Sequence, residues 1–169
     1  MNLNQQQTAY LSDTYNRMEQ KFRAECHRMN GRIPYISIDG AYPTWDESMI
    51  NWWTNGFWGG IMWQLYHAEN NSDYMSEANC LEEHLEKAFE HFDLLDHDVG
   101  FLWLHTAVAH YRLTGDPTAR QRGLRAAAVL ASRYCPAGEY IRAWNRPGLS
   151  QMIIDCVMNL PLLFWAASE

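Results

Sequence analysis

Apolar residues recur at helical spacing along most of the chain. One such series lies near the N-terminus and consists of Tyr10, Leu11, Tyr15, Met18, Phe22 and Cys26. Periodicity of this kind predicts helices, which we place at roughly 6–29, 57–67, 72–92, 100–115, 116–134 and 150–168. Strand-like alternation is confined to a short run within residues 31–46, which we expect to form a long loop. The fold class predicted from the pattern is all-α.

Several residues mark the expected helix ends. We expect Ser72 to cap the third helix and Asp116 to cap the fifth, with Pro117 as its first helical residue. Gly115 should end the fourth helix. Pro161 should interrupt or kink the last helix, because proline removes a backbone donor.

Some of the predicted helices are nearly hydrophobic all round, whereas others have a polar face. Helices of the first kind belong inside a protein, so a second layer of more amphipathic helices should surround them. Aromatic or acidic loops precede the apolar helices in a loose repeat. This alternation favours an α/α toroid, folded as one domain over residues 1–169, with loops at one end of the inner helices forming a site.

Composition and charge narrow the possible functions. The 169 residues are 47% hydrophobic and 14% aromatic, which indicates a globular chain with a substantial core. The formal net charge of −7, without a Lys/Arg cluster, argues against a nucleic-acid partner. The polar N-terminus lacks a secretory signal pattern, and the apolar runs are too interrupted for a membrane span. Four scattered cysteines without a CxxC pair indicate free thiols, so we expect a cytoplasmic protein.

Two aspartates lie within apolar runs that should be buried: Asp98 in DHDVGFLWL and Asp155 in QMIIDCVMNLPLLFWA. Hiding a carboxylate costs free energy, so it implies a partner, a cap or chemistry. Ile153, Ile154 and Cys156 should desolvate Asp155 and raise its pKa, which suits a general acid near neutral pH. Both aspartates also stand where a helix N-cap would fit, and for Asp98 taken by itself capping is the simpler interpretation.

Tryptophans supply the second half of a possible sugar site. Trp53 and Trp144 fall in predicted loops, where an indole ring could offer a flat apolar face to a pyranose. Trp63, Trp103 and Trp165 lie within predicted helices and are expected in the core. Acid groups beside aromatic platforms are typical of sugar-cleaving enzymes.

Other polar residues near these positions are weaker candidates. Arg142 and Arg146 flank Trp144 and could pair with a uronate carboxylate or a sulfate, although a solvated loop charge is the plainer interpretation. His97 could orient Asp98 or contact a sugar hydroxyl; a satisfied hydrogen-bonding group is the alternative. The sequence has no HExxH or comparable ligand spacing, so we expect no catalytic metal and no other cofactor.

Five short motifs, taken together and in order, resemble one enzyme family. They are WTNGFW at 53–58, HDVGF at 97–101, IRAW at 141–144, IIDC at 153–156 and NLPLL at 159–163. Each is weak alone, but their order and approximate spacing are similar to those of the unsaturated glucuronyl hydrolases, glycoside hydrolase family 88. The resemblance implies an (α/α)6 barrel of twelve helices in a chain about twice as long as this one. We therefore expect an N-terminal half of that barrel, whose exposed apolar faces would favour self-association.

The resemblance also implies a substrate and a mechanism. The substrate would be an oligosaccharide from glycosaminoglycan degradation that ends in a 4,5-unsaturated glucuronic acid. Asp155 would protonate the C4=C5 vinyl ether and then activate the water that adds to it. Asp98 would be the second carboxylate, which binds the sugar and tunes its partner, while Trp53, His97 and Trp144 would line the subsites.

Three alternatives remain open from the sequence. The chain could act on pectin fragments, as an unsaturated galacturonyl or rhamnogalacturonyl hydrolase. It could be an inactive half-barrel that binds carbohydrate or a protein partner without cleaving anything. It could also be a helical-repeat scaffold, although such a protein does not require loop tryptophans beside buried acids.

Overall fold

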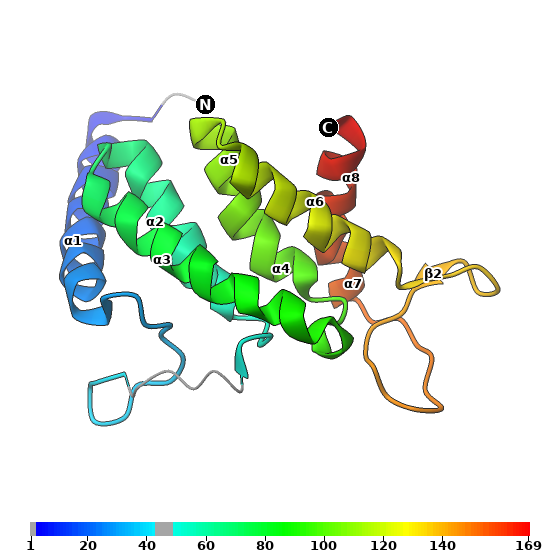
Figure 1. Cartoon of the computed structure of the whole chain (residues 1–169). Helices are drawn as coiled ribbons and strands as arrows, with labels where there is room; N and C mark the ends of the chain where they lie inside the picture. Colours follow the sequence, from blue (N-terminus) through cyan, green and yellow to red (C-terminus); the bar gives the residue numbers. More distant parts are fainter. Residues whose placement is uncertain (1–2, 43–48) are drawn as a thin grey trace.

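The computed structural model describes residues 3–42 and 49–169, and most of this part of the chain is helical (Figure 1). The α-helices are α1 (Gln5–Met29), α2 (Asn55–Glu69), α3 (Ser72–Glu86), α4 (Val99–Trp103), α5 (Ala109–Thr114), α6 (Pro117–Ala131), α7 (Asp155–Asn159) and α8 (Pro161–Ser168). A 3₁₀-helix, η2 (Lys87–Leu94), extends α3, and one π-helical turn, η3 (Leu104–Val108), joins α4 to α5. The all-α class predicted from the apolar pattern is confirmed.

The helices form two layers, as the difference between apolar and amphipathic segments predicts. The inner layer consists of α2, the α4–η3–α5 segment and α7–α8, and each of these packs against the next. The more polar helices α1, α3 and α6 lie outside: α3 covers α2, and α6 covers α4 and α8. Figure 1 shows the helices from α1 at the left to α8 toward the right, with the hairpin that contains β2 (Tyr140–Ile141) beyond α8. This is the arrangement of part of an α/α barrel.

The predicted helix boundaries hold in some places and are wrong in others. Asp116 caps α6 as expected, because its side chain accepts a hydrogen bond from the Ala119 amide at 2.8 Å. The cap of α3 is Asn71 and not Ser72, which is the first helical residue. The last helical segment begins only at Asp155, and a break before Pro161 divides it into α7 and α8.

One element was not predicted. Strands β1 (Tyr134–Cys135) and β2 (Tyr140–Ile141) form a short antiparallel hairpin between α6 and α7. Strands of two residues are too short for an alternation of apolar and polar residues, so the sequence gives no signal for them. Part of the predicted loop at 31–46 falls in residues 43–48, which lie outside the described residues.

The core holds the helices together and confirms the predicted buried tryptophans. Trp63, Trp103 and Trp165 are 0%, 1% and 4% exposed. Close approach between inner helices requires glycine at two positions. A Cβ on Gly56 would lie 2.7 Å from Leu102 Cα, and one on Gly100 would lie 2.7 Å from Asn159 Cα. These glycines bring α2, α4 and α7 near enough for their loop ends to share one cavity.

None of the described helices combines the length and the hydropathy that a membrane crossing requires.

Candidate active site

A cavity of about 600 Å³ opens at the loop end of the inner helices. Four segments line it: the turn before α2, the loop before α4, the loop after β2 and the first turn of α7. Its lining residues are Asn51, Trp52, Trp53, Asp96, His97, Asp98, Phe101, Trp144, Arg146, Ile153 and Asp155. The two aspartates and the two loop tryptophans singled out in the sequence thus share one cavity.

Asp98 is largely buried in this cavity, with 17% of its side chain exposed. Its Oδ1 lies 3.3 Å from His97 Nε2 and accepts a long hydrogen bond of 3.5 Å from Asn159 Nδ2. Burial, more than any other cause, raises the pKa of Asp98 to about 6; the charge of His97 acts in the opposite direction. The capping alternative is wrong, because Asp98 occupies the N-cap position of α4 without a capping hydrogen bond from its side chain.

His97 is buried, with an exposed fraction of 1%. Its Nδ1 lies 3.0 Å from the carbonyl oxygen of Ala143, and its ring meets the Trp144 indole edge to face at 6.0 Å between centroids. The side chain therefore bridges the loop before α4 and the loop after β2.

Asp155 lines the cavity but is exposed, so the prediction that its neighbours bury it is wrong. Asp155 is the first residue of α7, and of its apolar neighbours Ile154 and Met158 point outward, with exposed fractions of 80% and 61%, whereas Cys156 is buried away from the surface. An apolar neighbour in sequence desolvates a carboxylate only if it also packs over it. Of the two aspartates, Asp98 is the one that the fold largely buries.

The two tryptophans present their rings to the cavity in different ways. Trp53 is 40% exposed and is supported from behind by Phe57 and Phe101, with ring centroids 5.8 Å away in both cases. Trp144 lies between His97 and the Arg146 guanidinium, whose Cζ is 4.7 Å from the indole centroid. Of the other two tryptophans in this region, Trp52 lines the cavity and Trp58 is buried in the core.

Arg142 lies outside the cavity in which a substrate-binding residue is expected. Its side chain is exposed and does not line the cavity, whereas Arg146 does. The backbone of Arg142 is held instead, because its amide donates to the Arg133 carbonyl at 3.0 Å and its carbonyl accepts from Arg133 Nε at 2.8 Å. Of the two arginines that flank Trp144, the cationic candidate is therefore Arg146.

Two residues of the site were missed by the sequence interpretation. Asn159 is fully buried, and its amide nitrogen donates to the Asp155 carbonyl at 3.0 Å as well as to Asp98. Its Oδ1 accepts from the Phe101 amide at 2.8 Å, so Asn159 joins α7 to the start of α4. A polar residue inside the apolar run CVMNLPLL is the signal that could have found it. Arg133, which is also buried, carries no such signal.

One cluster near the cavity has donor atoms of the kind that bind metals. Asp96, His97 and Asp98 each offer one ligand atom, and these atoms lie within 4.8 Å of one another. Asp96 Oδ1, however, already accepts from the Asp98 amide at 3.0 Å, and His97 Nδ1 is occupied by the Ala143 carbonyl. The expected absence of a catalytic metal stays a prediction.

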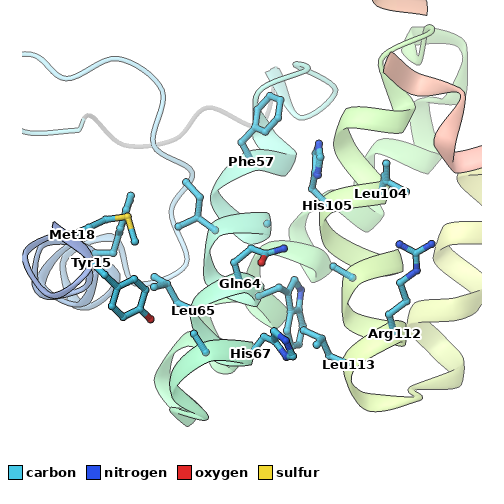
Figure 2. Close-up of a pocket in the computed structure, with 16 residues that line it drawn as sticks. Tyr15, Met18, Phe57, Gln64, Leu65, His67, Leu104, His105, Arg112 and Leu113 are labelled. Atoms are coloured by element: carbon cyan, nitrogen blue, oxygen red, sulfur yellow. The ribbon is translucent and has the colours of Figure 1, made fainter. Parts of the chain in front are cut away.

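A larger cavity of about 850 Å³ lies between α1, α2 and α5 (Figure 2). Figure 2 shows Tyr15 and Met18 of α1 facing α2, with His105 and Arg112 across from Phe57 and Gln64. Its lining is mostly apolar and, among the described residues, includes no carboxylate. The carboxyl groups that could act on a substrate therefore line the smaller cavity, whereas the larger cavity is mainly an apolar space.

Comparison with known proteins gives the same picture for sequence and fold. The chain is 36% identical over 138 residues to an unsaturated chondroitin disaccharide hydrolase of Streptococcus pneumoniae, and 37% identical over 149 residues to an unsaturated glucuronyl hydrolase of Bacillus sp. GL1. These matches cover 79% and 84% of this chain, but only 34% and 38% of the relatives. No protein-family model matches the chain.

Solved structures show the same partial coverage. The unsaturated glucuronyl hydrolase of Bacillus sp. GL1 superimposes with a TM-score of 0.77 at 31% identity, covering 87% of this chain and 40% of that one. An unsaturated glucuronyl hydrolase specific for heparin gives a TM-score of 0.67 at 28% identity, covering 81% and 36%. In sequence and in fold, the chain matches the N-terminal part of the unsaturated glucuronyl hydrolases and of their (α/α)6 barrel.

Proposed function

We propose that this chain carries the acid groups and aromatic platforms of a hydrolase acting on oligosaccharides with a 4,5-unsaturated glucuronic acid at the non-reducing end. The observation that carries the proposal is the shared cavity of Asp98, Asp155, Trp53 and Trp144. The relatives named above, two of which are called unsaturated chondroitin disaccharide hydrolase and unsaturated glucuronyl hydrolase, support the substrate class. Two carboxyl groups beside aromatic rings can hold a sugar and move protons at it.

In the proposed reaction, protonated Asp155 gives its proton to C4 of the unsaturated ring. The vinyl ether then becomes electrophilic at C5, and a water adds there while the Asp155 carboxylate takes the proton that the water loses. The resulting hemiketal opens, the linkage to the next sugar breaks, and Asp155 has regained its proton. Because Asp155 lines the cavity, its carboxyl group can meet both the sugar and the attacking water.

Asp98 has a different proposed task. Its Oδ1 faces His97 and Asn159, so Oδ2 is the oxygen best placed to accept a hydrogen bond from a sugar hydroxyl. Trp53 and Trp144 would pack against the C–H faces of the sugar rings. The Arg146 guanidinium, which sits over Trp144, would attract a uronate carboxylate or a sulfate at the edge of the cavity.

The deciding experiment follows the loss of the conjugated C4=C5 absorbance in unsaturated chondroitin, hyaluronan and pectin disaccharides. Turnover that prefers the glucuronyl substrates is expected, and Asp155→Asn should abolish it while leaving binding measurable. Retained turnover in Asp155→Asn would contradict the assignment of the acid. Preference for the pectin disaccharide would favour the galacturonyl or rhamnogalacturonyl alternative, and binding without any turnover would favour a carbohydrate-binding half-barrel.

Two further expectations stay predictions. The exposed apolar side chains of α7 and α8, such as Met158 and Phe164 at 61% and 74% exposure, would be covered if two copies of the chain associate. A mass that rises with concentration in light scattering, and falls to the monomer in Phe164→Asp, is the expected result. The cytoplasmic location inferred from the free cysteines also remains to be tested.

A further inference from the structure

Arg133 ties together the two loops that carry the candidate site. This residue follows α6 and is 7% exposed. Its guanidinium donates to the carbonyl oxygens of Arg142 at 2.8 Å, Leu95 at 3.1 Å and Ala143 at 2.8 Å, and to Asn145 Oδ1 at 2.8 Å. Leu95 precedes the Asp96–Asp98 loop, and the other acceptors flank Trp144. One buried cation therefore sets the distance between the acids and the aromatic platform.

The Ala143 carbonyl connects Arg133 to His97. Its oxygen accepts from Arg133 Nη2 and lies 3.0 Å from His97 Nδ1. A carbonyl oxygen can only accept, so Nδ1 must carry a hydrogen at this contact. In a neutral imidazole, the lone pair is then on Nε2.

That lone pair faces another acceptor. His97 Nε2 is buried, has no hydrogen-bond partner by geometry, and lies 3.3 Å from Asp98 Oδ1. A lone pair opposite a carboxylate oxygen, both shielded from water, is unfavourable unless a proton lies between them. Either the carboxyl group or the imidazole must hold it.

We propose that Arg133 is a positioning residue of the site: by fixing the Ala143 carbonyl it holds His97 with Nδ1 protonated, so that His97 Nε2 and Asp98 share one proton. The raised pKa of Asp98, about 6, agrees with a carboxyl group that gives up its proton reluctantly. The charged or titratable side chains around the pair belong to the adjoining loops and to α7, and they are Asp96, Arg133, Arg146, Asp155 and Cys156.

The shared proton has a consequence for the substrate, which rests on the function proposed above. An unsaturated uronate brings its own carboxylate into a cavity already lined by Asp96, Asp98 and Asp155. At pH below about 6, a proton held between Asp98 and His97 removes the repulsion from one of these acids without changing the residue. Arg133 would thus act through His97 on how well an anionic sugar is accepted.

Nitrogen-15 NMR of the histidine rings tests the proposal on the chain as it exists. In the wild type, His97 Nδ1 should stay protonated from about pH 5 to 8, while the Nε2 shift should change as Asp98, whose pKa is about 6, loses its proton. Arg133→Met, which keeps the length but removes the donors, should release His97 into a mixture that contains the Nε2–H tautomer. Arg142→Met, a matched arginine with an exposed side chain, should leave the spectrum unchanged.

A wild-type His97 found as the Nε2–H tautomer would overturn the proposal, as would an unchanged His97 pattern in folded Arg133→Met. Should Arg133→Met fail to fold, Asp98→Asn provides the second test, because its amide replaces the shared proton by a fixed donor. The change of the Nε2 chemical shift at about pH 6 should then vanish, while Nδ1 stays protonated. Persistence of that change would contradict the sharing. If the His97 signals behave as expected but the chain shows no turnover, only the proposed function is refuted. If the chain turns over substrate but the His97 signals do not behave as expected, only this inference is refuted.

Discussion

Asp98 should weaken the fold at neutral pH, because the folded chain holds an ionised carboxylate in a largely buried place. The pKa of Asp98 rises from 3.8 to about 6 on folding, and a shift of that size is worth about 3 kcal/mol at about 1.4 kcal/mol per unit. Asp98→Asn removes the charge and keeps the shape of the side chain; its amide nitrogen, in the place of Oδ1, can donate to His97 Nε2, at the loss of the long hydrogen bond from Asn159. We therefore expect the variant to be more stable than the wild type by ~1–3 kcal/mol at pH above the raised pKa.

The pH dependence of the stability gained in Asp98→Asn shows whether burial of the Asp98 charge causes it. Because the pKa of Asp98 is raised in the folded state, the folded chain binds more protons than the unfolded chain between pH 3.8 and about 6. The contribution of Asp98 to stability therefore falls as pH rises through this window. The advantage of Asp98→Asn should be near zero below pH 3.8, grow between 3.8 and about 6, and level off above that.

Urea unfolding of both proteins across this pH range is the assay. Asp93→Asn, which changes an exposed aspartate in the preceding 3₁₀-helix, is the matched control and should change stability by only a few tenths of a kcal/mol. A loss of stability in Asp98→Asn at neutral pH, or a gain that does not vary with pH, would refute the reasoning. The first result would mean that the charge of His97 outweighs burial.

Two further changes test how the helices are held. Glu82 is 1% exposed and accepts from Trp63 Nε1 at 2.8 Å, while His110 Nδ1 and Arg122 Nη1 lie 3.1 and 3.4 Å from its other oxygen. Glu82→Ala should lower the free energy of unfolding in urea by about 3–5 kcal/mol, because it leaves these buried groups without their acceptor. Glu83→Ala, at an exposed position, should change it little. A loss below about 1 kcal/mol in Glu82→Ala would contradict this reasoning. Gly100→Ala would place a methyl group against Asn159. It should lower the free energy of unfolding by about 1–3 kcal/mol and shift the NMR signals of the Asn159 side-chain amide. Unchanged unfolding and unchanged amide signals would argue against close contact of α4 with α7.

Local patterns were enough to predict the helices and the layers. Periodicity is a property of neighbouring residues, so α1, the Asp116–Pro117 start of α6 and the break at Pro161 could be located from the sequence. The π-helical turn at Leu104–Val108 has no comparable local signal. It inserts into a segment whose apolar pattern reads as one continuous helix.

The site was predicted only in part, because burial depends on what packs over a residue. The sequence shows that Asp155 has apolar neighbours, but it does not show that Ile154 points away from it. Arg133 was missed for a related reason: its acceptors lie as far as 38 residues away, on Leu95, and only the folded chain brings them together. The aspartates and loop tryptophans that line the cavity could be predicted, whereas the residues that hold them in place could not.

The central claim is that the cavity between Asp98, Asp155 and Trp144 is where the saccharide binds. Titrating the chain with an unsaturated chondroitin disaccharide, and following the indole N–H signals assigned by Trp→Phe variants, tests it most directly. The account predicts that the signals of Trp53 and Trp144 shift in a saturable way, while that of Trp63, which lines the larger cavity, does not. Shifts confined to Trp63, or no shift at any indole, would contradict it.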